Sequence, residues 1–140
     1  MLSTILIDAG PLIALFDKDD KYHKKIISFI KKKKYKFVTT TAILTEVSHM
    51  LDFNVQVQIM FLEWVVKEGV ILHEIEQQDI ARIIELTRKY SDRPMDFADA
   101  TLVTVAEKTG INTIISIDSD FDIYMLSRKA KIENVFRGSS

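Results

Sequence analysis

The chain has 140 residues and a mass of 16.1 kDa, enough for one hydrophobic core and too little for two. Hydrophobic residues make up 47% and charged residues 28%, which excludes a disordered or fibrous chain. Nineteen Lys and Arg against twenty Asp and Glu give a net charge of −1, so overall charge gives no reason to expect nucleic-acid binding. Because there is no cysteine, disulfides, thiolate metal sites and cysteine nucleophiles are excluded.

No segment predicts a membrane span or a signal peptide. The longest uninterrupted apolar run covers residues 12–16, far short of the roughly 20 residues that cross a bilayer. Asp8 also interrupts the apolar N-terminus before a signal-peptide core is complete. The absence of cysteine fits the cytoplasm, so we expect a cytoplasmic protein without a membrane partner.

Short β-rich runs alternate with longer amphipathic segments along the chain. Residues 4–7 form an unbroken apolar run, which is typical of a parallel strand buried on both faces. In chain order, the pattern predicts a strand over residues 4–7, a helix over 22–33, a strand over 37–39, helices over 42–51 and 55–67, a strand over 70–72, helices over 77–90 and 96–109, a strand over 113–117 and a weaker one near 133–136. Gly69 and Gly110 stand where two of the helices are expected to stop.

Strands separated by helices of this length predict a three-layer α/β/α sandwich with a central parallel sheet. No linker or internal repeat divides the chain, so we expect one domain over residues 1–136. Residues 137–140 are expected to be a disordered tail or a cloning remnant outside the domain. Ligands of such folds bind beyond the carboxyl ends of the strands, which makes the acidic residues at those ends the first candidates for a site.

Two aspartates directly follow predicted strands. Asp8 comes after the first strand and Asp118 after the strand over residues 113–117. If these strands are parallel neighbours, both carboxylates emerge at one edge of the sheet. The alternative interpretation is that each aspartate only caps the helix or turn that follows, which is a common use of Asp.

Two further acids lie on predicted helices. Asp99 falls in the middle of the apolar face of its helix, and a carboxylate directed into a core is costly unless it is compensated. The alternative is that Asp99 is the third-position partner in a capping box begun by Asp96. Glu46 lies at the margin of an apolar helix face, where the alternative is simple solvation.

Four acids gathered in one pocket would repel one another and raise one another's pKa values. A divalent cation removes this conflict, and ligands that are all oxygen suit Mg²⁺ or Mn²⁺. The residue pattern therefore predicts a metal site built from Asp8, Glu46, Asp99 and Asp118.

The sequence resembles the PIN-domain ribonucleases, and among them the VapC-like toxins of toxin–antitoxin pairs. The resemblance covers nearly the whole chain and rests on four segments in the correct order: ILIDAGPLIALFD, TTTAILTEVSHML, PMDFADATLVTVAEKTG and TIISIDSDF. Each segment alone is weak, but together they form a specific signal.

The resemblance also implies roles for individual residues. The four family acids correspond to Asp8, Glu46, Asp99 and Asp118, which would be catalytic and metal-binding. Asp96 and Asp120 match accessory acids, and Ser116 stands where the family usually has a threonine hydroxyl near the metal. The implied activity is metal-dependent cleavage of RNA to 5′-phosphate and 3′-hydroxyl ends, and the implied partners are a cognate antitoxin and a second copy of the chain.

Positive charge is concentrated in one segment. Residues 18–36 contain nine Lys and two Asp, a stripe that could follow a phosphate backbone, with Lys24 and Lys25 as candidate substrate contacts. The alternative is a solvated helix face. Arg93 is a more local candidate for contacting RNA beside the metal.

Two other functions remain open at this stage. One is a PIN nuclease that acts in RNA processing or on DNA outside toxin biology. The other is a non-catalytic α/β module like a phospho-accepting receiver, which also gathers acids around Mg²⁺ at strand ends. A receiver normally has an acidic pair after its first strand, whereas Ala9 follows Asp8 here.

Overall fold

A parallel five-stranded sheet forms the centre of the computed structural model, which describes residues 2–92, 95–118, 120–122, 124 and 131–136. Its strand order is β3-β2-β1-β4-β5, and every neighbouring pair is parallel. The strands are β1 (Ser3–Ile7), β2 (Tyr35–Thr39), β3 (Val70–Leu72), β4 (Thr113–Ile115) and β5 (Glu133–Asn134). The predicted parallel sheet is confirmed. The tail expected at residues 137–140 lies outside the described residues.

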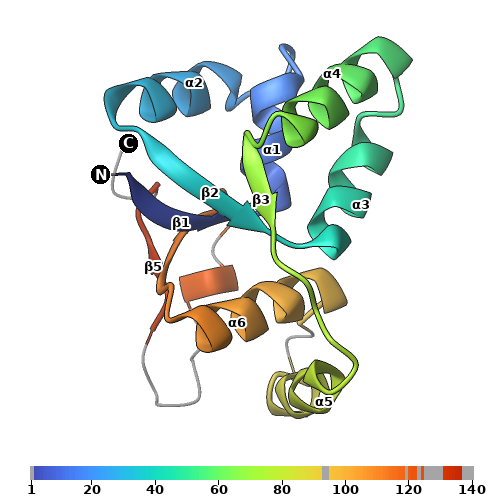
Figure 1. Ribbon diagram of the computed structural model, residues 1–140, viewed down its shortest axis with the longest axis vertical. Coiled ribbons are helices and arrows are strands. Elements are labelled where there is room, and N and C mark those ends of the chain that lie inside the picture. Colours follow the sequence, from blue (N-terminus) through green and yellow to red (C-terminus); the bar gives the residue numbers. More distant parts are fainter. Residues whose placement is uncertain (1, 93–94, 119, 123, 125–130, 137–140) are drawn as a thin grey trace.

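Helices cover the sheet on both faces. They are α1 (Ala9–Phe16), α2 (His23–Lys32), α3 (Thr41–Met50), α4 (Val55–Val66), α5 (Asp79–Lys89) and α6 (Phe97–Thr109), with a 3₁₀ turn at Asp120–Asp122. Figure 1 shows α1, α2 and α4 above the sheet and α5 and α6 below it, which confirms the predicted three-layer sandwich. None of the helices in the described part of the chain is long and apolar enough to cross a membrane.

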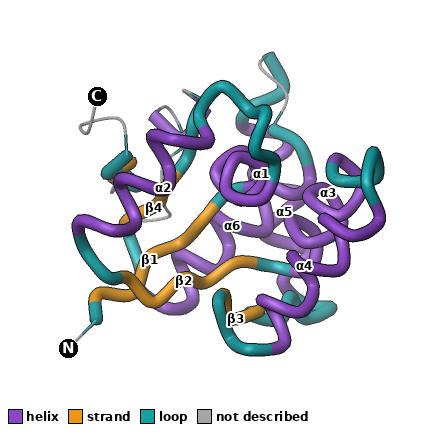
Figure 2. The backbone as a smooth tube through the Cα atoms, turned by 90° about the horizontal axis from the view of Figure 1, so that it is seen from above, coloured by secondary structure: helices purple, strands orange, loops and turns teal. Residues whose placement is uncertain are grey.

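Helix α1 was not predicted from the sequence. Its residues are apolar almost throughout, so they show no helical alternation of polar and apolar positions, and such a helix is stable only when it is buried. Pro11, Leu12 and Ala14 are buried, and the helix follows directly on β1 (Figure 2). The consequence for function is that Asp8 occupies the junction between a central strand and a buried helix.

Strand β4 ends at Ile115, two residues before the predicted end. The amide group of Asn134 replaces the strand ladder at the next residue: its Oδ1 accepts from the backbone N–H of Ser116 at 3.2 Å, and its Nδ2 donates to the Ser116 carbonyl at 2.9 Å. Ser116 is therefore held in place by a side chain from β5 at the carboxyl edge of the sheet.

Helix α4 ends close to Gly69, as predicted, but Gly69 is not the residue whose left-handed conformation ends the helix. Helix α4 ends at Val66, and the residue in the left-handed conformation after it is Glu68, with φ 64°. Gly69 is needed for space, because a Cβ there would lie 2.1 Å from the indole of Trp64. Gly110, with φ 79°, terminates α6 as predicted.

Candidate active site

Asp8 is buried, with 4% of its surface exposed, at the junction of β1 and α1. Its backbone N–H donates to the Ile115 carbonyl at 3.0 Å, which continues the pairing of β1 with β4. One carboxylate oxygen, Oδ1, accepts from the N–H of Ala9 at 2.8 Å and caps α1. The other, Oδ2, accepts from the Ser116 hydroxyl at 3.0 Å. The interpretation of Asp8 as a helix cap is therefore correct, and the capping hydrogen bond uses only one of its two carboxylate oxygens.

Burial is the main reason that the pKa of Asp8 rises to about 7. The negative charges of Asp118 and Glu46 raise this pKa further, while the hydrogen bonds from Ala9 and Ser116 partly offset the increase. These hydrogen bonds do not balance the negative charge. Asp8 thus carries a strong preference for a proton or a cation.

Asp99 lies in the first turn of α6 and is also buried. Asp96 caps this helix, because its Oδ1 accepts from the Asp99 backbone N–H at 2.8 Å, which is one half of a capping box. The Asp99 carboxylate points elsewhere and accepts from the Tyr124 hydroxyl at 3.3 Å. Burial and the charges of surrounding aspartates raise the pKa of Asp99 to about 8; those aspartates are Asp8, Asp96, Asp118 and Asp120.

Asp118 and Glu46 are exposed members of the same group. Asp118 follows β4, and its Oδ1 accepts from the Asp120 N–H at 3.0 Å, which shapes the turn there. Glu46 projects from α3, and partial burial together with the charges of Asp96 and Asp118 raises its pKa. Asp8 and Asp99 are therefore the sheltered members of the group, and Glu46 and Asp118 are its solvent-facing members.

The structure thus brings the four predicted acids into one electrostatic cluster, together with Asp96 and Asp120. We call these six residues the acidic cluster. Mutual pKa effects of this kind need proximity, because the interaction of two charges falls with their separation. The cluster lies where the carboxyl ends of β1 and β4 meet α3 and α6.

The chemistry of the acidic cluster fits a divalent cation. All of its side-chain donors are carboxylate oxygens, which suit Mg²⁺ or Mn²⁺, and a cation would offset the charge that now raises the pKa values of Asp8 and Asp99. Within the described ranges, no three acidic or histidine side chains already stand in an arrangement that could hold a metal ion. Gathering this set around one ion therefore requires side-chain movement.

The other predicted site residues fall in different places. Ser116 is fully buried and bonded to Asp8. Lys24 and Lys25 are exposed on α2, which is not one of the elements that form the acidic cluster. Arg93 lies outside the described residues.

Two residues with a role in shaping the cluster were missed from the sequence. Tyr124 donates its hydroxyl to Asp99, and Asn134 holds the backbone of Ser116. Neither stands in a pattern that signals its role, since each reaches the cluster from a segment remote from its partner in sequence.

Replacing Ser116 with Ala is expected to move the pH dependence of any cleavage reaction upward by about one pH unit. The Ser116 hydroxyl donates to Asp8 and lowers its pKa, so its loss leaves Asp8 protonated to a higher pH. The measurement is the pH–rate profile of the variant beside that of Ser116→Thr, which keeps the hydroxyl. An unchanged profile in Ser116→Ala would show that Asp8 does not control the rate.

Comparison with known proteins agrees with this fold. The family model for the PIN domain matches residues 5–124. The chain belongs to the PIN-domain family. No curated protein sequence matches the chain.

Two solved structures of low sequence identity share the fold. The VapC20 toxin of Mycobacterium tuberculosis, which cleaves the sarcin–ricin loop, superposes with a TM-score of 0.76 at 20% identity over 84% of this chain and 92% of that one. The VapBC2 complex of Rickettsia felis, bound to a DNA fragment from its promoter, gives a TM-score of 0.64 at 10% identity over 94% of this chain and 98% of that one. The fold is thus similar to that of VapC toxins, and family and fold together support a nuclease.

Proposed function

We propose that the chain is a divalent-metal-dependent endoribonuclease that hydrolyses RNA to 5′-phosphate and 3′-hydroxyl ends. The observation that carries this proposal is the acidic cluster in a PIN-domain fold: Asp8 and Asp99 are buried at the carboxyl edge of the sheet with strongly raised pKa values. Perturbed carboxyl groups that share one edge of a sheet are typical of a functional site. We also propose that the protein acts in the cytoplasm.

Asp8, Glu46, Asp99 and Asp118 would hold Mg²⁺ or Mn²⁺, with Asp96, Asp120 and Ser116 as accessory groups. When bound, the ion supplies the Lewis acidity that lowers the pKa of a water and offsets charge on the phosphate. The protein's own contribution is orientation. The hydroxyl of Ser116 donates to Asp8 and that of Tyr124 donates to Asp99, so the orientations of these two buried carboxylates are fixed.

The test uses the purified chain with structured RNA and either Mg²⁺ or Mn²⁺. We expect cleavage that EDTA abolishes and that Asp8→Asn reduces by at least about 100-fold, within the range seen when one catalytic group is lost. The matched control is Asp52→Asn, because Asp52 is an exposed aspartate that pairs with His49 outside the acidic cluster. Mapping the product ends checks the predicted chemistry. Equal cleavage by Asp8→Asn and the parent would refute the assignment.

We further propose that the chain is the toxin of a toxin–antitoxin pair and forms a homodimer. One surface supports a protein partner: the end of α3 and the outer side of α4 expose large apolar side chains that the core leaves uncovered. They are Met50, Phe53, Val55, Ile59, Met60, Leu62 and Val66, with exposures from 40% to 82%. Several large apolar side chains exposed on adjoining segments are typical of an interaction site. Phe61, by contrast, is fully buried in the core, and Trp64 packs against it.

Expression of the chain alone in bacteria is expected to arrest growth, and co-expression of the small reading frame beside its gene is expected to relieve the arrest. Light scattering of the purified chain is expected to give twice the monomer mass. If the chain cleaves RNA but its expression does not affect growth, the result would favour a PIN nuclease of RNA processing. A monomeric mass in light scattering would contradict the proposed dimer.

A further inference from the structure

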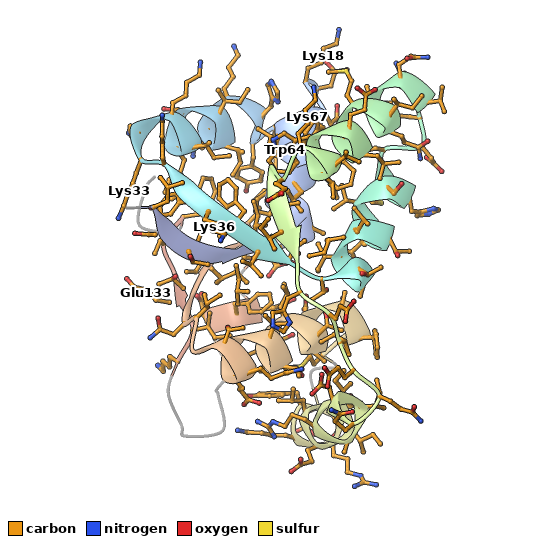
Figure 3. All side chains as sticks on the ribbon, in the orientation of Figure 1. Lys18, Lys33, Lys36, Trp64, Lys67 and Glu133 are labelled. Carbon is orange, nitrogen blue, oxygen red and sulfur yellow. The ribbon has the colours of Figure 1, made fainter. Side chains whose placement is uncertain are left out.

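Positive charge is strongly segregated in this protein. Residues 18–36 carry nine Lys and two Asp, a net charge of +7, whereas the whole chain carries −1 and the remainder therefore −8. We call the nine lysines of this segment the basic surface: Lys18, Lys21, Lys24, Lys25, Lys31, Lys32, Lys33, Lys34 and Lys36. Figure 3 shows Lys18 at the top of the molecule, Lys33 at its left edge and Lys36 over the sheet, so the surface extends from the segment before α2 to the start of β2.

Among the described residues, no acid forms an ion pair with a lysine of the basic surface. All nine lysines are exposed, and the ion pairs found among the described residues use other cations, such as Arg82 with Glu107 and Lys108 with Asp79. The carboxylate of Asp20 accepts from the backbone N–H of Tyr22 and so shapes a local turn. The positive potential of this surface therefore faces solvent.

The basic surface is also hollowed along α2. One hollow of about 550 Å³ is lined by His23, Lys24, Ile27, Ser28, Lys31 and Lys32, and a second of about 220 Å³ by Lys24, Lys25, Ser28, Phe29 and Lys32. Lys24, Ser28 and Lys32 follow one another at four-residue intervals, so they lie on one side of the helix with a rise of about 6 Å between neighbours. Lys24 and Lys32 thus flank the Ser28 hydroxyl, and all three residues line both hollows.

One end of the basic surface lies at the edge of the sheet opposite to the acidic cluster. Tyr35 pairs with Ser3 at the amino end of β1, and Asp8 follows five residues later, about 16 Å away at the rise of a strand. The lysines at residues 33–36 are therefore near the amino edge, and the acids are at the carboxyl edge. A ligand that contacts both must be extended.

We propose that the basic surface binds the sugar–phosphate backbone of RNA that flanks the cleaved bond. This inference rests on the proposed function. A polyanion is repelled by the uncompensated charge of the acidic cluster, so the substrate needs cationic contacts elsewhere, and lysine contacts to phosphate give affinity without sequence preference. The exposure of these lysines, the hollows along α2 and the lack of ion pairs to these lysines within the described residues all suit a strand of phosphates.

The test measures RNA binding in a chain that cannot cleave it. In an Asp99→Asn background, Lys24, Lys25, Lys31 and Lys32 are changed to Gln, and affinity for a fluorescent RNA hairpin is measured by anisotropy at several salt concentrations. The matched control removes four exposed charges outside the basic surface, with Lys67, Arg88, Lys89 and Lys131 changed to Gln. Thermal unfolding checks that each variant is folded.

We expect Kd for the hairpin to rise at least about tenfold in the first variant at low salt, and the slope of log K against log salt to fall by about 2 to 3. The control is expected to bind within about twofold of its parent. Equal affinities of the two variants would overturn the proposal, as would displacement of the RNA by polyglutamate at equal charge. If the unmutated chain binds RNA through these lysines but does not cut it with either metal, the proposed role of the basic surface in RNA binding is supported and the proposed nuclease activity is contradicted.

Discussion

Asp99→Asn is expected to abolish RNA cleavage and, in the same protein, to stabilise the metal-free fold. Asp99 is buried among like charges, which raise its pKa to about 8, so at neutral pH its ionised form opposes folding. Asn keeps the shape and an oxygen that accepts from Tyr124, but it carries no charge. We expect the free energy of unfolding of the metal-free variant to rise by several kcal/mol at pH 8, with about 5 kcal/mol as the limit that a pKa of about 8 sets, and its cleavage rate to fall by at least about 100-fold.

This pair of opposite effects separates a functional residue from a structural one. If the Asp99 carboxylate stabilised the fold, its replacement would lower the free energy of unfolding. If Asp99 is instead a metal ligand held among like charges, its replacement raises the free energy of unfolding of the metal-free protein. Urea unfolding in EDTA and RNA cleavage in Mn²⁺ measure the two effects, with Asp52→Asn as the exposed control. A destabilised Asp99→Asn, or one that still cleaves RNA, would contradict the role proposed for Asp99.

The metal-free protein is expected to lose stability as the pH rises from about 4 to about 8. Asp8 and Asp99 have folded-state pKa values of about 7 and about 8, far above the value of about 3.9 for an unfolded aspartate. Between these limits the folded state binds more protons than the unfolded state, so their contribution is fully present below pH 4 and is lost as the pH passes through 7 and 8. At about 1.4 kcal/mol per pKa unit, the two pKa values set an upper limit of about 10 kcal/mol, and we expect a loss of several kcal/mol across this range.

Comparison with the Asp8→Asn/Asp99→Asn double variant isolates these two groups, because its stability should depend much less on pH over the same interval; what remains includes the contribution of Glu46, whose pKa is also raised. Asp79, whose pKa is lowered by the hydrogen bond from Lys108, contributes with the opposite sign only near and below pH 4, so it does not disturb the measurement. The experiment is urea unfolding in EDTA at several pH values. If the free energy of unfolding changed with pH in the same way in the parent and the double variant, Asp8 and Asp99 would not have the raised pKa values described here.

Added Mn²⁺ is expected to reverse this pH dependence in the parent. A divalent cation binds the ionised carboxylates, so the stabilisation that it gives grows as the pH rises. The double variant lacks both buried carboxylates and is expected to show little of this effect, which connects the stability measurement to the proposed metal site.

Several features could be predicted from the sequence because they depend on local pattern. The apolar run of β1 and the helical spacing of α2 to α6 led to the parallel sandwich, and the lysine-rich segment was evident from composition alone. The positions of Asp8 and Asp118 after strands, and of Asp99 on an apolar helix face, identified the acids without any coordinates. Each of these signals lies within a short stretch of chain.

Other features depended on contacts between distant segments. Helix α1 has no amphipathic period because it is covered on nearly all sides, so burial rather than pattern stabilises it. Strand β4 is shortened because Asn134, 18 residues away, takes the backbone groups of Ser116. Glycine is required at position 69 because a Cβ there would clash with the indole of Trp64, and local conformational preference does not predict this clash.

The sequence by itself determined which acids and which lysines the protein has and the secondary structure on which most of them lie. Only the tertiary structure decided that Asp8 and Asp99 are sheltered while Glu46 and Asp118 face solvent, and that Ser116 and Tyr124 each bond one of the sheltered pair. The physical reason is that the pKa of a carboxyl group depends on burial and on neighbouring charges, and both are properties of the folded arrangement rather than of any short segment.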